Sequence, residues 1–108
     1  MSRYFTKIEY KMDIDFLAKL DEARAYADIP FIINSAYRDK EQNARVGGTP
    51  NSSHLKGLAV DIKAKDSRTR FIILDALFAV GFSRVGVGST FIHVDLDLDK
   101  DQNVVWTY

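Results

Sequence analysis

The sequence predicts an α+β domain in which helices pack against a central, mainly antiparallel sheet. Two long segments, residues 13–29 and 66–80, carry apolar residues at helical spacing. Short runs rich in β-branched residues separate these segments and follow them. Helices alternate with strands early in the chain, whereas the last strands follow one another directly, and this order favours α+β. At 108 residues the chain is long enough for one modest core, so we expect a single domain, residues 1–108.

The first helix is expected to begin near Asp13 and to end before Pro30. Its apolar positions recur at helical spacing and are Ile14, Phe16, Leu17, Leu20, Ala23 and Ala27. Asp13 and Asp15 suit the first turn, where the helix dipole favours negative charge. The helix should stop before Pro30, because the residue preceding a proline avoids the α region. We expect residues 1–12 to form an extended lead-in.

Two further helices are predicted from their caps. Asp39 can cap a short helix that runs to about Val46. Asp66 or Ser67 can cap the next helix, which has a broad apolar face. Gly81 stands where the glycine that follows a helix C-terminus belongs.

Five short segments are expected to form the sheet. They are residues 31–33, 58–62, 84–87, 91–96 and 104–108. A Gly-Ser-Thr turn at residues 88–90 joins the third segment to the fourth, and the fifth is expected at the sheet edge. The stretch Gly-Gly-Thr-Pro-Asn-Ser-Ser at residues 47–53 is a strong loop signal.

The composition excludes several classes of function. Lys+Arg and Asp+Glu each number 15, and a formal net charge of zero argues against a mainly electrostatic binder of nucleic acid or membrane. Without cysteine, disulfides and thiolate metal ligands are excluded. No apolar run approaches the ~20 residues of a membrane span, and the first residues lack the apolar core of a signal peptide. Nothing in the pattern indicates an obligate partner face, so we expect a monomer.

Two histidines and one aspartate form a candidate metal site. His54 and His93 are the two histidines of the chain, and Asp61 lies within an otherwise apolar strand. A buried carboxylate needs a partner. A metal ion is one such partner, and an arginine or backbone amides are others. Two imidazoles and a carboxylate suit zinc, and three protein ligands leave a position open for water, as in catalytic sites. The residue types alone leave open that both histidines are hydrogen-bonded core residues.

Four motifs occur in a fixed order along the chain. They are Ser35-x-Tyr37-Arg38, Asn43-x-x-Val46-Gly47-Gly48, Ser52-x-His54-x-x-Gly57-x-Ala59-x-Asp61 and Phe91-Ile92-His93-Val94-Asp95. Together they resemble the zinc D-alanyl-D-alanine carboxypeptidase family, which includes vancomycin-resistance dipeptidases and phage endolysins. The resemblance implies a hedgehog-like α+β fold and a zinc metallopeptidase. It also implies a peptidoglycan stem peptide as substrate, cleaved at terminal D-Ala-D-Ala or at an internal bond.

The resemblance also assigns roles to residues. The implied Zn2+ ligands are His54, Asp61 and His93. Arg38 matches the family arginine that binds the substrate's carboxylate or carbonyl, since a guanidinium fork grips a carboxylate and can steady an oxyanion. A structural salt bridge is the other interpretation of Arg38. Ser52 would hydrogen-bond the bound peptide or cap its loop, and Gln42 would polarise the scissile carbonyl or be a solvated helix residue.

The chain departs from the family at the general base. Many members have Glu or Asp three residues before the last histidine ligand, where this chain has Thr90, and others have a histidine at the position of Phe91. Asp95 is the substitute, because residues i and i+2 of a strand share a face and Asp95 would lie beside His93. It would take a proton from water or orient His93. The missing glutamate also leaves an alternative, a non-catalytic zinc module that docks a peptide or protein.

Overall fold

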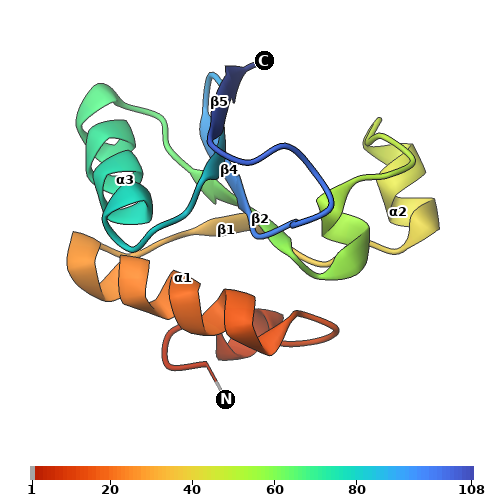
Figure 1. Cartoon of the computed structure of the whole chain (residues 1–108), viewed down its shortest axis with the longest axis horizontal. Coiled ribbons are helices and arrows are strands. Elements are labelled where there is room, and N and C mark those ends of the chain that lie inside the picture. The colour runs from red at the N-terminus through yellow and green to blue at the C-terminus, as the bar shows by residue number, and fades with distance from the viewer. Residues whose placement is uncertain (1) are drawn as a thin grey trace.

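A five-stranded sheet organises residues 2–108, the part of the chain that the computed structural model describes (Figure 1). Its strands are β1 (Ile33–Ser35), β2 (Ala59–Lys63), β3 (Arg84–Val87), β4 (Phe91–Asp95) and β5 (Val104–Thr107). The helices are α1 (Ile14–Ala27), α2 (Lys40–Arg45) and α3 (Ser67–Ala79), with short 3-10 helices η1 (Thr6–Ile8) and η2 (Ser53–Lys56). The predicted α+β class is therefore confirmed. Within residues 2–108, no helix combines the length and apolar composition needed to cross a membrane.

The strand order is β1-β2-β4-β3-β5. The pairs β1/β2, β2/β4 and β4/β3 are antiparallel, as predicted, whereas the edge strand β5 runs parallel to β3. The central pairing of β2 with β4 sets Asp61 directly opposite His93. Residues directly opposite on neighbouring antiparallel strands lie on one face with their side chains close together. The sheet register therefore joins two candidate ligands that are far apart in the sequence.

The helices begin and end where their caps predict. Asp13, Asp39 and Asp66 each accept a hydrogen bond from a first-turn backbone N–H. Gly81 follows α3 with a φ of +96°, a conformation that glycine adopts without steric cost. The helices α1 and α3 pack against each other, and their buried apolar side chains meet those of the sheet in one core. The short α2 lies away from α3, beside η2 (Figure 1).

Two local expectations are wrong. The lead-in is not extended, because it contains η1 and folds back on α1, where the Asp21 carboxylate accepts the backbone N–H groups of Arg3 and Tyr4. The first strand begins at Ile33 rather than at Phe31, which is buried in the core beside the Phe5 ring. Of the apolar run at residues 31–33, Phe31 thus packs into the core, and β1 begins only at Ile33.

Candidate metal centre

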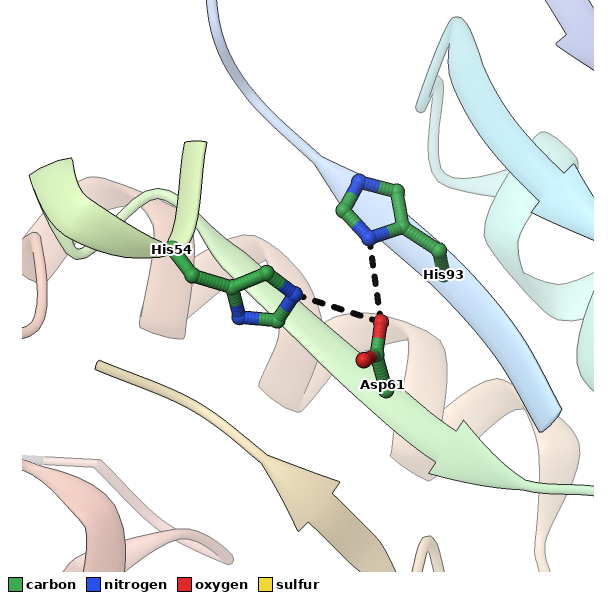
Figure 2. Close-up of side chains that lie close together, drawn as sticks. All are labelled: His54, Asp61 and His93. Carbon is green, nitrogen blue, oxygen red and sulfur yellow. Dashed lines mark hydrogen bonds and ion pairs between the residues drawn. The ribbon is translucent and has the colours of Figure 1, made fainter. Parts of the chain in front are cut away.

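Three side chains converge near the middle of the β2/β4 pair (Figure 2). His54 comes from η2, Asp61 from β2 and His93 from β4. The Asp61 Oδ1 atom lies 3.3 Å from His54 Nε2 and 3.0 Å from His93 Nδ1. One ligand atom from each residue lies within 4.8 Å of the others, so a single metal ion could be held by all three. We call these residues the His-Asp-His group.

The local sequence around His54 fixes the position of its ring. The Ser52 hydroxyl accepts the backbone N–H of His54 at 3.3 Å and caps η2. Gly57 ends η2 with a φ of +69°, and a Cβ there would collide with the backbone carbonyl of Lys11. In the spacing Ser-x-His-x-x-Gly, the serine therefore caps the start of η2 and the glycine ends it, and the short helix between them directs the His54 ring toward the sheet.

The hydrogen bonds around the group leave three acceptor atoms facing one another. His54 Nδ1 lies 2.8 Å from the Ala36 carbonyl, and His93 Nε2 lies 2.7 Å from an Asp95 carboxylate oxygen. In the neutral tautomers that these partners assign, each donates its proton outward. His54 Nε2, His93 Nδ1 and Asp61 Oδ1 then all present lone pairs to the same space. Only a proton or a cation makes that arrangement favourable, and this donor set suits zinc.

The pKa values of Asp61 and His93 also show that the group favours a proton or a cation. Burial alone would raise the pKa of Asp61, but hydrogen bonds to His54 and His93 outweigh it and hold the pKa well below its usual range. Burial alone would lower the pKa of His93, but its hydrogen bonds to Asp61 and Asp95 raise it above 6.5. In the metal-free protein these contacts therefore favour proton uptake by His93, and that proton would supply part of the positive charge that the group requires. Zinc binding must displace that proton.

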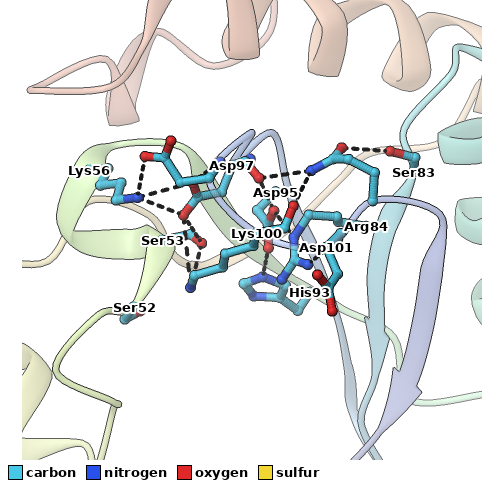
Figure 3. Close-up of polar contacts among 12 residues, drawn as sticks. Ser52, Ser53, Lys56, Ser83, Arg84, His93, Asp95, Asp97, Lys100 and Asp101 are labelled. Carbon is cyan, nitrogen blue, oxygen red and sulfur yellow. Dashed lines mark hydrogen bonds and ion pairs between the residues drawn. The ribbon is translucent and has the colours of Figure 1, made fainter.

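A buried pair supports His93 from behind (Figure 3). Asp95 is 1% exposed and uses one carboxylate oxygen for His93 Nε2. Its other oxygen accepts Arg84 Nε at 2.7 Å and the backbone N–H of Asp97 at 3.1 Å. Burial alone would raise the pKa of Asp95, but the bonds to His93 and Arg84 lower it, so the carboxylate stays ionised. The Arg84 guanidinium also lies over the Trp106 ring, 5.0 Å from its centroid.

Sequence reasoning missed Arg84 and Trp106. A signal for Arg84 was present, because an arginine in the short strand Arg-Val-Gly-Val is buried and needs a carboxylate partner. The β3/β4 register sets Val85 opposite Val94, which brings Arg84 next to Asp95. Trp106 is brought to the site by the parallel pairing of β5 with β3, which the sequence pattern did not predict.

Arg38 is held in place by three side-chain partners. Its guanidinium donates to Ser35 Oγ at 2.9 Å, to Asn43 Oδ1 at 3.3 Å and to Asp61 Oδ2 at 3.3 Å. Its backbone N–H donates to the His54 carbonyl at 3.1 Å. The salt bridge to Asp61 fixes the second oxygen of that carboxylate and turns the first toward the histidines. Arg38 also lines the cavity beside the group.

A cavity of about 410 Å³, the metal-site cavity, opens beside the His-Asp-His group. Ser52 lines it while capping η2, so both contacts expected of Ser52 are compatible with its place. Gln42 does not line it, because its side chain accepts the Asp39 backbone N–H in the capping box of α2. Thr90 is exposed in the turn before β4. Among residues 2–108, the carboxylates that line this cavity are Asp61 and Asp95.

The geometry can be compared with known protein families. A family model described as Peptidase M15 matches residues 4–95, which span most of the chain and all of the His-Asp-His group. A comparison with curated proteins finds no match. The family is zinc-dependent, and the group at β2 and β4 could hold such an ion. The chain therefore belongs to the Peptidase M15 family and is a peptidase of that zinc-dependent kind.

Proposed function

We propose that the protein hydrolyses the peptide stems of bacterial peptidoglycan, at terminal D-Ala-D-Ala or at an internal stem bond. The observation that carries the proposal is the set of three potential metal-ligand atoms, His54 Nε2, His93 Nδ1 and Asp61 Oδ1, turned toward one space beside a cavity. Bound zinc would supply the means to activate water and polarise a peptide carbonyl. The stem-peptide substrate rests on the motif resemblance to D-alanyl-D-alanine carboxypeptidases.

Arg38 is proposed to contact the substrate. Its guanidinium lies on the cavity wall, and its side chain is 17% exposed. In the same position it bonds to Asp61, so it orients a metal ligand and offers positive charge to a substrate oxygen. Ser52, whose hydroxyl borders the cavity, is proposed to hydrogen-bond the peptide backbone.

Asp95 is proposed to orient His93 rather than to contact the reacting water. It meets His93 at Nε2, the ring nitrogen opposite the one that faces Asp61. Both its oxygens are already bonded, to His93 on one side and to Arg84 on the other. A carboxylate in that position fixes the ring and its tautomer and makes Nδ1 a better ligand.

A second function has one observation in its favour. Thr90 replaces the glutamate of many relatives. Among the described residues, the carboxylates of the cavity wall are Asp61, a candidate metal ligand, and Asp95, whose two oxygens are both bonded. A zinc module that docks a peptide without cleaving it would have this arrangement. Such a module would bind zinc but would lack a residue that accepts a proton from the attacking water.

Digestion of purified peptidoglycan by the zinc-loaded protein distinguishes the two functions, with the products identified by mass spectrometry. Loss of one terminal D-Ala would identify a carboxypeptidase, and fragments with a new amino terminus an endopeptidase. His54→Ala is the inactive control. An undigested wall, with zinc bound and stem peptides binding saturably, would favour the docking module.

A further inference from the structure

The charges on the cavity wall are unbalanced. Among the described residues, its charged side chains are three cations and two carboxylates, namely Arg38, Arg84, Lys100, Asp61 and Asp95. Arg38 is paired with Asp61 and Arg84 with Asp95. Lys100, in the loop between β4 and β5, is the cation that no carboxylate of the wall neutralises. Bound zinc would add further positive charge to the same cavity.

The nearest carboxylate to Lys100 is Asp97, which is already neutralised from its other side. Lys56 Nζ lies 3.0 and 3.1 Å from the two Asp97 oxygens, and Ser53 Oγ donates to Asp97 at 2.8 Å. Lys100 Nζ stands farther off, at 3.8 Å from Asp97, and donates to Ser53 Oγ at 3.1 Å. The Lys100 side chain is 24% exposed. Lys56 is thus sufficient to neutralise Asp97, and the positive charge of Lys100 is left over.

The ammonium of Lys100 lies on the side of the cavity wall that faces the candidate metal ligands. In Figure 3 it lies beside Ser53, on the side toward His93 and Ser52, whereas Lys56 approaches Asp97 from a different direction. Ser53 precedes the metal-ligand candidate His54 in the chain. An ammonium has three donors, and the contacts to Ser53 and Asp97 leave at least one for a ligand. Lys56 does not line the cavity.

We propose that Lys100 is a specificity-determining residue that binds a carboxylate of the substrate close to the scissile bond. The inference rests on the proposed peptidase function and defines its substrate class as peptides with an anionic group there. The charge-assisted bond from Nζ would anchor the anion, with the Ser52 hydroxyl nearby as a second donor. The family match ends at Asp95, so Lys100 belongs to a segment that the family model does not cover.

Two sources could supply the carboxylate. It is either the free C-terminus of a peptide ending in D-Ala-D-Ala or a carboxylate within a longer stem. The first makes the enzyme a carboxypeptidase and the second allows endopeptidase action. Two substrate pairs separate them: an N-acylated tripeptide ending in D-Ala-D-Ala and its C-terminal amide, and a stem peptide with its internal carboxylates free or amidated.

The test compares kcat/KM for each free and amidated pair with the zinc-loaded protein and its variants. The wild type should prefer the free form of one pair by about tenfold or more. Lys100→Gln should abolish that preference, mainly through KM, and Lys100→Arg should restore part of it. Lys56→Gln is the matched control, because it contacts the same Asp97 from outside the cavity, and it should keep the preference. Equal cleavage of free and amidated forms by the wild type, or the same loss in both lysine variants, would overturn the proposal.

A binding measurement separates failure of this inference from failure of the proposed function. The same peptides are titrated into metal-free protein and followed by NMR, so that neither turnover nor direct binding to zinc contributes. Free carboxylate peptides should shift resonances of the loop at residues 96–103 saturably in the wild type and in Lys56→Gln, and not in Lys100→Gln. If no peptide is cleaved but this pattern is seen, the peptidase function fails and the carboxylate site stands. If peptides are cleaved but neither these resonance shifts nor a carboxylate preference is seen, the proposed carboxylate site is wrong and the peptidase function stands.

Discussion

Replacing Asp95 by Asn tests how the metal centre is supported. The amide keeps the shape of the carboxylate but removes its charge, and it weakens the 2.7 Å contacts to His93 Nε2 and Arg84 Nε. Replacing a partner that orients a metal-bound imidazole typically costs 10–100-fold in metal affinity. We therefore expect Asp95→Asn to raise the Kd for zinc by about 10–100-fold, or about 1.4–2.7 kcal/mol.

The same change also affects folding, so affinity and stability must be measured separately. Asp95→Asn leaves the guanidinium of Arg84, 11% exposed, without its ionised partner. Breaking a buried ion pair from one side costs about 3–5 kcal/mol. Urea unfolding of metal-free protein would report that cost, and adding Arg84→Met to Asp95→Asn should recover part of it without restoring zinc affinity. Asp99→Asn, on the same loop with an 86% exposed side chain, is the control for both measurements.

Zinc affinity is measured by competition with a chromophoric chelator at a temperature where every variant is folded. A Kd for zinc within about twofold of the wild type, together with loss of turnover, would refute the orienting role. Asp95 would then act on a proton in the reaction, the other role that the sequence allows. A weaker Kd with turnover restored at saturating zinc would support the orienting role.

Three further predictions concern other parts of the site. Arg38→Lys should lower kcat/KM for stem peptides by about tenfold or more in steady-state assays, because a lysine cannot bond to several partners as the guanidinium fork does. Metal-free protein should lose stability in urea titrations as pH rises above 6.5. The pKa of His93 is raised above its unfolded value of 6.5, so its contribution to folding stability is full below pH 6.5 and is lost as pH rises through the folded pKa. The pKa of Asp61 is lowered, so its contribution to stability is lost only in acid, below pH 3.8. Gly86→Ala should lower Tm by several degrees and change the fluorescence of the single tryptophan, since the added Cβ would lie 2.5 Å from the Trp106 indole nitrogen.

Local patterns in the sequence predicted the parts of the site that local geometry determines. The caps at Ser52 and Gly57 and the strand around Asp61 each follow from a few neighbouring residues. Gln42 shows the limit of resemblance, because the spacing Asp39-x-x-Gln42 is itself a capping-box signal and the structure uses the side chain there. The contact of Ser53 with Asp97 spans 44 positions and had no sequence signal, because it depends on how the loop after β4 folds over η2.

That loop ties the two histidine segments together. Asp97 bonds through its side chain to Ser53, the neighbour of His54, and through its backbone N–H to Asp95, the partner of His93. At 1% exposed, the Asp97 side chain has no access to substrate, yet it links both ends of the metal centre. Lys100 is three residues further along the same loop and faces the cavity. A loop built in this way can change the residue that meets the substrate while Asp97 keeps the ligands in place, because the two tasks fall on different side chains. Relatives that differ in substrate should therefore differ at the position of Lys100 before they differ at that of Asp97.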